Sequence, residues 1–382
     1  MHDASCGEPE VGEIGMVLVF GAPGRYVQGP GVLDRLGEFI AACGPRAIVL
    51  ADRFVLGLIE ARVRASCEAA GVAVHIEATE GEVTEDALAD LRARLSGIEA
   101  DVIVAAGGGK CIDTGKAISH ERGAAYISLP TVASNDAPTS KNYVVYDAHH
   151  RLVEVRHLPV SPRYVVVDTA LIALAPRVFL LAGIGDALTK KFEAEQCLRA
   201  GGNNMFGARS SLSGVALAAA CYDVLRRHAE TALGEAGSGQ PSRAFEELIE
   251  AVLLMSGLGF ESGGLSIAHA MTRGLSKVPG VREAQHGLQV AYALLVQLAL
   301  EEGRDAAFFA DLYGFYDRLG LPRTLAALGA TGVDDAMLAA IAEPTLAAPH
   351  ARNFERPLSV ADLVDAMRAV ETASSSGPVR AA

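Results

Sequence analysis

The sequence predicts an α/β amino-terminal domain with a mainly parallel sheet, followed by an all-α carboxy-terminal domain. Three observations support this fold class: short β-branched runs alternate with amphipathic stretches in the first half, such runs stop near Asp168, and Ala- and Leu-rich segments follow. Alternating strands and helices are typical of a doubly wound parallel sheet. We expect the domains to cover residues 1–170 and 171–382, with the boundary within residues 169–176.

The elements of the first domain follow from short apolar runs and the stretches between them. Strands are expected at residues 16–20, 47–50, 72–76, 101–105, 125–129 and 164–167. Amphipathic helices are expected at residues 55–70, 84–95 and 112–120. The polar piece 147–151 separates two further short runs, 143–146 and 152–155, which predicts a hairpin.

The second domain is expected to consist of helices only. Its helix-like segments cover residues 176–200, 205–233, 242–260, 283–302 and 306–319. Two-domain enzymes often hold their ligands in the cleft between the domains. Residues of the two halves that could bind a ligand or take part in a reaction are therefore expected to face each other.

The composition excludes several classes of protein. With 382 residues, 50% of them hydrophobic, the chain is long enough for two buried cores. The formal net charge of −13 opposes contact with nucleic acid and with anionic membrane surfaces, so neither is an expected partner. The six cysteines form no CxxC pair. Residues 1–13 lack the pattern of a secretory signal. No apolar run reaches the ~18 residues of a membrane span. We therefore expect a cytoplasmic protein with reduced thiols.

A glycine-rich turn lies between the expected strand at 101–105 and the helix at 112–120. It contains Gly107, Gly108, Gly109 and Lys110. Glycines allow positive φ angles and close approach of the backbone to a ligand, and the free N–H groups of the next helix favour a phosphate. The turn is not a GxGxxG motif, because Ile112 stands at the last glycine position, and it also departs from the P-loop pattern. We interpret it as a pyrophosphate-binding turn; the alternative is a tight turn without a ligand.

Two further polar features follow expected strands. Asp52 comes after the strand at 47–50, a common place for a carboxylate that holds a ribose hydroxyl, although an acidic residue there is also a frequent helix cap. Residues 129–140 read LPTVASNDAPTS and follow another strand. They would present hydroxyl groups and the Asp136 carboxylate at the carboxyl edge of the sheet, where ligands bind in open α/β folds. The alternative is a plain connecting loop.

Three residues of the helical half form a candidate metal site. Asp186 lies between glycine and alanine in AGIGDAL, His269 ends ESGGLSIAH, and His286 precedes a glycine. A lone histidine of this kind is more often a core or capping residue. Two of them beside an aspartate favour ligation of Zn²⁺ or Fe²⁺. Glycines inside helices cost about 1 kcal/mol each, so their clustering suggests close approach of a ligand.

Taken together, these motifs resemble the glycerol dehydrogenases, in the zinc-using branch of the iron-containing alcohol dehydrogenase superfamily. The segments that carry the resemblance are PGRYVQG (23–29), GGGKCIDTGKA (107–117), LPTVASNDAPTS (129–140), AGIGDAL (182–188), ESGGLSIAH (261–269) and HG (286–287). They occur with the family's order and spacing. The resemblance implies the fold shared by dehydroquinate synthase and iron-containing alcohol dehydrogenases, with a Rossmann-like sheet. It also implies a homo-oligomer, expected to be an octamer.

The resemblance implies roles for single residues as well. NAD would lie in the first domain, with Asp52 at the adenosine ribose. The residues along the cofactor would be Gly107, Gly108, Gly109, Lys110 and Asp113, and its nicotinamide side would be lined by Thr131, Ser134, Ser140, Asn142 and Tyr146. Asp136 would contact a small polyol, and the metal ligands would be Asp186, His269 and His286. The metal is expected to be Zn²⁺, with Fe²⁺ as the alternative, and it would lower the pKa of a substrate hydroxyl so that the carbon can release a hydride to NAD.

Departures from the family pattern lie near the expected pocket. Lys141, Asn142 and Tyr143 replace a usual small-Leu-Ser sequence, Thr272 stands where a second histidine is usual, and Arg282 lies in a loop that is often histidine-rich. A larger or more anionic substrate could use Lys141 or Arg282, so the identity of the polyol stays open. The alternatives are a sugar-phosphate cyclase of the dehydroquinate synthase type, a glycerol-1-phosphate dehydrogenase, and a non-catalytic NAD-binding protein.

Overall fold

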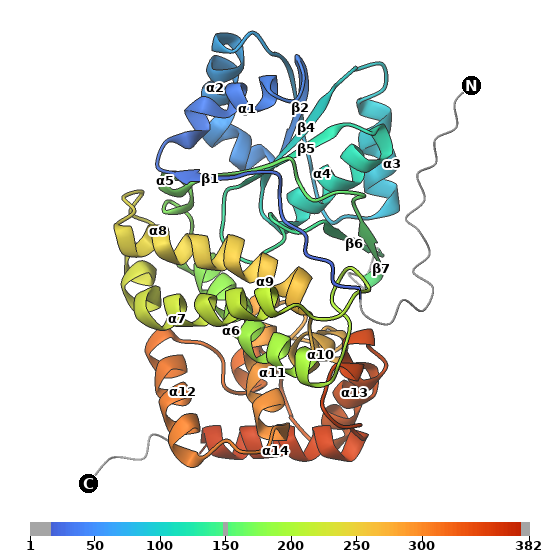
Figure 1. The fold of residues 1–382 in the computed structure, drawn as a ribbon, viewed down its shortest axis with the longest axis vertical. Helices are drawn as coiled ribbons and strands as arrows, with labels where there is room; N and C mark the ends of the chain where they lie inside the picture. Colours follow the sequence, from blue (N-terminus) through green and yellow to red (C-terminus); the bar gives the residue numbers. More distant parts are fainter. Residues whose placement is uncertain (1–16, 148–151, 376–382) are drawn as a thin grey trace.

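The amino-terminal part of the chain forms a six-stranded parallel sheet (Figure 1). The computed structural model describes residues 17–147 and 152–375. The order of the sheet is β1-β8-β5-β4-β2-β3, and its strands are β1 (Tyr26–Gly29), β2 (Arg46–Ala51), β3 (Ala73–Ala78), β4 (Val102–Gly107), β5 (Ala125–Pro130) and β8 (Tyr164–Asp168). Five of the six expected strands are thereby confirmed.

The sixth expected strand, at residues 16–20, is wrong. Met16 lies outside the described residues, and Leu18 makes only an isolated bridge with Arg209. Leu18 and Phe20 remain exposed, so their apolar pattern does not reflect burial in the sheet. The edge strand is instead β1, which pairs with β8 from Tyr26 onwards.

Helices and a hairpin cover the two faces of the sheet. One face packs against α1 (Leu36–Ala41) and α2 (Arg53–Ala69), and the other packs against α3 (Glu85–Arg94), α4 (Gly109–Arg122) and the hairpin of β6 (Asn142–Tyr146) and β7 (Leu152–His157). Along β2, Val49 belongs to the first of these cores, and Ile48 and Leu50 belong to the second. Burial on both faces explains why the strand is a continuous apolar run. The predicted hairpin is confirmed, and its turn at 148–151 lies outside the described residues.

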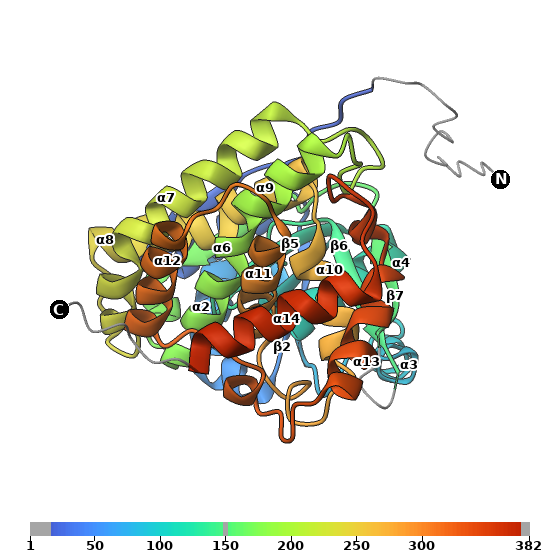
Figure 2. The same ribbon diagram turned by 90° about the horizontal axis from the view of Figure 1, so that it is seen from below.

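The rest of the chain is helical and lies on one side of the sheet domain (Figure 1). Its longer helices are α6 (Arg177–Arg199), α7 (Leu212–Glu235), α8 (Arg243–Glu250), α9 (Ser256–Gly263), α10 (Ile267–Leu275), α11 (His286–Leu300), α12 (Ala306–Leu319), α13 (Asp335–Leu346) and α14 (Val360–Ser375). A short helix α5 (Thr169–Ile172) follows β8 directly. In Figure 2, α14 crosses the face opposite the sheet.

Two of the expected helices differ from the observed ones. The segment 205–233 becomes helical only at Leu212, because Ser211 accepts a hydrogen bond from Gly214 N as the helix cap, and residues before it form a bridge between Asn203 and Arg209. The segment 242–260 is interrupted by a π-helical turn at Ala251–Met255. Such turns are frequent at functional sites.

No single helix among the described residues is long and apolar enough to cross a membrane. The bent pair formed by Arg243–Gly263 and Ile267–Leu275 passes a test of length and composition, with an angle of 98° between its parts. Apolar side chains of both parts, such as Ile249, Val252 and Met271, are buried in the core of the helical half.

The strand order creates a ligand-binding position. The chain adds β3 on one side of β2 and β4 on the other, so the direction of winding reverses between β2 and β4. In open α/β sheets, ligands bind outside the carboxyl ends of the strands at such a reversal. Asp52 follows β2 and Gly108 follows β4, so both lie at this point.

Candidate active site

One large cleft joins the carboxyl ends of the strands to helices α6, α10 and α11. Its volume of about 2090 Å³ exceeds the roughly 300–1,000 Å³ of a pocket for one small ligand, so a dinucleotide and a substrate fit together. Its lining includes nearly all residues predicted from the sequence: Asp52, Gly108, Gly109, Lys110, Asp113, Thr131, Ser134, Asp136, Ser140, Asn142, Tyr146, Asp186, His269 and His286. Gly107 is the exception. It ends β4, and its carbonyl accepts a hydrogen bond of 3.2 Å from Thr131 N.

The glycine-rich turn places the first turn of α4 in the cleft. Gly108 caps the helix without a side-chain hydrogen bond, so the first N–H groups of the helix are free to hold a phosphate. None of the three glycines has a positive φ angle, so the turn does not use the positive φ angles that glycine allows. They are needed for space: a Cβ on Gly107 would lie 2.7 Å from Cys111 Cβ, and one on Gly109 would lie 3.0 Å from Asn135 Nδ2.

The expected cofactor residues differ in their surroundings. Asp52 caps α2 by accepting a hydrogen bond of 2.8 Å from Val55 N, so it serves as a helix cap and also lines the cleft. The exposed ammonium of Lys110 forms an ion pair with Glu82. Burial raises the pKa of Tyr146 to about 12.

Asp113 and Lys116 connect α4 to the polar loops. Asp113 accepts a hydrogen bond of 3.1 Å from Val144 N, its second oxygen lacks a hydrogen-bond partner, and burial raises its pKa to about 6. Lys116 is fully buried and donates to the carbonyls of Ala137 at 2.7 Å and Asn142 at 2.6 Å. Lys116 therefore fixes the loop after β5 against the start of β6.

The loop after β5 is held by the π-helical turn. Thr139 Oγ1 donates to the Leu253 carbonyl at 2.7 Å, and Ser256 Oγ, directly after the turn, donates to Asp136 Oδ2 at 3.0 Å. A Cβ on Gly257 would lie 1.9 Å from Thr139 Oγ1, so the helix reaches this loop only with a glycine there. Burial raises the pKa of Asp136, and the nearby Lys190 opposes this shift.

Three helices bring the predicted metal ligands together. Asp186 lies on α6, His269 on α10 and His286 at the first position of α11, and their ligand atoms lie within 4.8 Å of one another. His269 Nε2 is 3.1 Å from Asp186 Oδ1. His286 is exposed toward the cleft, although protein surrounds it on its other sides, and this partial loss of water lowers the pKa of its imidazole, which favours the neutral, metal-binding form.

The glycines beside these ligands serve helix packing. A Cβ on Gly287 would lie 1.9 Å from the Ala182 carbonyl, and one on Gly185 would lie 2.6 Å from the Gly287 carbonyl. The expectation that the clustered glycines admit a ligand is therefore wrong for this pair. They let the backbones of α6 and α11 touch, and this contact brings Asp186 close to His286.

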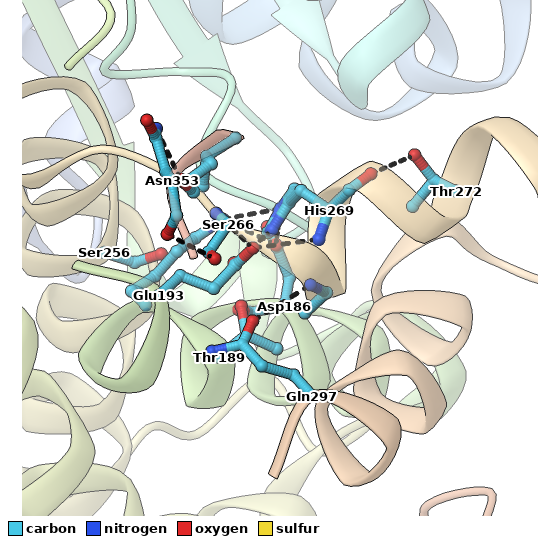
Figure 3. A network of polar contacts seen from close by, with 12 residues as sticks. Asp186, Thr189, Glu193, Ser256, Ser266, His269, Thr272, Gln297 and Asn353 are labelled. Atoms are coloured by element: carbon cyan, nitrogen blue, oxygen red, sulfur yellow. Dashed lines mark hydrogen bonds and ion pairs between the residues drawn. The ribbon is translucent and has the colours of Figure 1, made fainter. Parts of the chain in front are cut away.

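Glu193 orients His269 (Figure 3). Its Oε2 lies 2.5 Å from His269 Nδ1, and its Oε1 accepts 2.9 Å hydrogen bonds from the backbone N of His269 and of Ser266. A carboxylate on one ring nitrogen directs the other toward a metal, as in many metal sites. Burial would lower the pKa of His269, but Glu193 raises it to about 9, and His269 holds the pKa of Glu193 down at about 2. The donor set and this orientation fit a divalent metal.

Lys190 lies at the centre of the same cluster. Its Nζ is 2.7 Å from Asp186 Oδ1, 3.1 Å from Asp136 Oδ2 and 3.0 Å from His269 Nε2. Burial alone would lower its pKa, but the carboxylates of Asp136 and Asp186 raise it above its usual range. Conversely, burial would raise the pKa of Asp186, but Lys190 and His269 lower it well below its usual range.

Lys190, Glu193 and Ser256 are not among the residues predicted from the sequence. Lys190 and Glu193 follow Asp186 by four and seven positions, so helical spacing alone places them on its face of α6. Ser256 carries no comparable signal, because its contact with Asp136 depends on the π-helical turn.

The departures from the family pattern have different outcomes. Lys141 is buried, its Nζ lies 4.8 Å from the centre of the Phe206 ring, and it is not part of the cleft lining. Tyr143 is also buried outside the lining, with its hydroxyl 3.0 Å from His120 Nδ1. The cleft is lined by Arg282, Thr272 and Asn142. Of the two cations suggested for an anionic substrate, Lys141 and Arg282, only Arg282 lines it.

Comparisons with known proteins identify the family and the fold of the chain. Residues 23–169 match the family model described as iron-containing alcohol dehydrogenase. The chain is 38% identical to the glycolaldehyde reductase of Halobacterium salinarum over 86% of this chain and 90% of that protein. It is 38% identical to a glycerol dehydrogenase of Escherichia coli over 82% of this chain and 85% of that protein. The crystal structure of glycerol dehydrogenase from Schizosaccharomyces pombe is similar with a TM-score of 0.90 and 34% identity, covering 94% of this chain and 92% of that one. The expected fold and the resemblance are confirmed: the chain belongs to the iron-containing alcohol dehydrogenase family, with glycerol dehydrogenases among its relatives.

Proposed function

We propose that this protein is a metal-dependent dehydrogenase that transfers a hydride between a small polyol and NAD. The substrate is glycerol, oxidised to dihydroxyacetone, or a related vicinal diol or hydroxyketone. The observation that carries the proposal is the position of the Asp186, His269 and His286 cluster. It lies in the same cleft as the free first turn of α4 and the Asp136 loop. Cofactor, substrate and metal sites thus meet in one space.

The residues divide into three groups by what they would hold. The first turn of α4 would bind the pyrophosphate of NAD, with Asp52 at the ribose and Asp113 along the cofactor. The nicotinamide would face Thr131, Ser134, Ser140, Asn142 and Tyr146. Asp186, His269 and His286 would bind the metal, Zn²⁺ or else Fe²⁺, and a donor set of one carboxylate and two imidazoles leaves a position open for the substrate.

The protein itself would orient the reactants. The bound metal supplies Lewis acidity that lowers the pKa of a substrate hydroxyl. Asp136, fixed by Ser256 at 3.0 Å, would accept a hydrogen bond from a second hydroxyl and so align the reacting carbon with the nicotinamide ring. Glu193 would keep Nε2 of His269 directed at the metal position.

The test uses substitutions of the metal ligands. Asp186→Asn and His269→Ala should purify as folded proteins with little bound metal and with most of the activity lost. Bound metal is measured by elemental analysis, and activity by NAD reduction with glycerol, 1,2-propanediol and 2,3-butanediol, with and without added Zn²⁺. Full activity of either variant contradicts the assignment. Absence of NAD reduction by the wild-type protein with every diol contradicts the reaction.

Three broader features belong to the same proposal. The chain would divide into an NAD-binding unit at residues 1–170 and a metal-binding unit at 171–382. It would act in the cytoplasm as a homo-oligomer, expected to be an octamer. Light scattering after gel filtration measures the molecular mass and so tests the oligomer.

A further inference from the structure

The ammonium of Lys190 contacts two of the groups that would hold a metal, Asp186 and His269. Both atoms that would bind the metal, Asp186 Oδ1 and His269 Nε2, lie within 3.0 Å of Lys190 Nζ. Metal–ligand bonds to carboxylate oxygen and imidazole nitrogen are roughly 2.0–2.2 Å long. An ammonium that keeps both of its contacts therefore competes with a metal for the same two atoms, and its positive charge repels the metal.

The surroundings of Lys190 keep its charge in place. The side chain is 1% exposed, and the carboxylates of Asp186 and Asp136 are 2% and 10% exposed, so these charges are withdrawn from water. Buried carboxylates near each other need a cation between them. Lys190 is that cation, and its ammonium pairs with Asp136 of the substrate loop and with Asp186 of α6.

A second position for the ammonium lies next to the first. Asp136 Oδ2 is 3.1 Å from Nζ, and the Phe260 ring centre is 5.3 Å away, within the range of a cation–π contact. The flexible four-carbon stem of lysine allows Nζ to leave Asp186 and His269 while it stays with Asp136 and Phe260. Movement of one side chain is then sufficient to open the metal position.

We propose that Lys190 is a resident counter-ion of the metal site. It occupies the position between Asp186 and His269 in the metal-free chain, and it must withdraw toward Asp136 when a metal binds. The metal competes with a tethered ammonium, so Lys190 weakens metal affinity and stabilises the metal-free fold. This inference rests on the metal site of the proposed function.

The experiment compares Lys190→Met with Lys191→Met in the full-length, metal-free protein. Lys191 is the neighbouring lysine on α6, and its Nζ lies over the rings of Tyr222 and Phe192 rather than in the metal cluster. The dissociation constant for Zn²⁺ is measured by competition with a chromophoric chelator, and the thermal midpoint is measured with and without Zn²⁺. Lys190→Met should bind Zn²⁺ about tenfold tighter or more, because a like charge at this distance is removed. Its metal-free midpoint should fall, and its gain on adding Zn²⁺ should exceed that of the wild type. Lys191→Met should keep the wild-type affinity.

The outcomes separate this inference from the proposed metal site. If the wild type binds Zn²⁺, His286→Ala does not, and Lys190→Met binds no tighter than the wild type, the resident counter-ion is refuted while the metal site stands. If only Lys190→Met binds Zn²⁺, the counter-ion is supported and the proposed metal dependence of the native protein falls. If neither binds Zn²⁺, both ideas fall. Lys190→Gln, which keeps a hydrogen-bond donor without the charge, replaces Lys190→Met in every comparison if the latter does not fold.

Discussion

Replacing Glu193 by glutamine tests how the cluster holds His269. The carboxylate lies 2.5 Å from His269 Nδ1 and accepts two backbone hydrogen bonds of 2.9 Å from Ser266 and His269. Glutamine keeps the size of the side chain but removes its charge, and its amide nitrogen would face at least one of these N–H donors. Loss of such a partner of a ligating histidine usually weakens metal binding about 10- to 100-fold. That range corresponds to about 1.4–2.8 kcal/mol of binding free energy.

The assay is a chelator competition that gives the dissociation constant for Zn²⁺, combined with steady-state NAD reduction. We expect Glu193→Gln to bind Zn²⁺ about 10- to 100-fold more weakly, and activity to return when Zn²⁺ is raised above the new dissociation constant. Glu195→Gln is the matched control, because Glu195 is half-buried on the same helix and does not contact His269. An unchanged affinity in a folded Glu193→Gln variant would refute the orienting role of Glu193.

Four further predictions concern other parts of the site. The pKa of His269 in the metal-free chain is raised from 6.5 to about 9, so a proton must leave before a metal binds, and affinity for Zn²⁺ should rise about tenfold per pH unit up to that pKa. The same shift stabilises the metal-free fold fully below pH 6.5, so its thermal midpoint should fall progressively between about pH 6.5 and pH 9 and change little above that range. Gly287→Ala should cost about 1–3 kcal/mol of stability by overpacking. At Gly57 an added Cβ meets nothing within 4 Å, so Gly57→Ala should stabilise the protein by about 0.5–1 kcal/mol, and denaturant titration measures both changes. Ser256→Ala should raise KM for the polyol about tenfold and leave KM for NAD unchanged, since it frees a buried carboxylate in the substrate loop. Asp52→Asn and Asp52→Ala should both raise KM for NAD, but only the alanine variant should lower the thermal midpoint, by losing a cap that contributes about 1 kcal/mol.

Most of the strands that could be predicted are buried along nearly their whole length, and such strands are continuous apolar runs in the sequence. All six residues of β4 are buried, and β2 is buried from Ala47 to Ala51, so each is an unbroken apolar run with a helix after it. The edge strand β1 has four half-buried residues, and its partner β8 follows more than 130 positions later. Its local apolar pattern is weaker than that of residues 16–20, of which residues 17–20 are at least partly exposed in the structure. Contacts with residues far away in the sequence decide whether β1 or the segment 16–20 becomes the edge strand. A local pattern of apolar residues does not contain this information.

The site could be predicted as a set of residue types and not as a geometry. Asp186, His269 and His286 are recognisable because carboxylate and imidazole groups are uncommon in apolar helices, and two of the three stand beside a glycine. The contact from Ser256 to Asp136 spans 120 positions and depends on the π-helical turn before Ser256. The role of Lys190 depends on how closely α6 approaches the loop after β5. Both features result from packing between elements that are far apart in the chain.

The glycines of the site explain how that packing is achieved. A Cβ on Gly183 would lie 2.0 Å from the Ala133 carbonyl, and one on Gly287 would lie 1.9 Å from the Ala182 carbonyl. Helix α6 therefore touches the substrate loop at Gly183 and touches α11 at Gly287, and Asp186 lies about one turn further along α6. An alanine at either glycine must push the elements apart, so metal affinity and stability should fall together. Substitution of Glu193 leaves these glycine contacts intact. It also costs stability, because the amide nitrogen of glutamine would face a buried N–H donor, so the loss of metal affinity in this variant comes from the ligand His269 and not from a displaced helix.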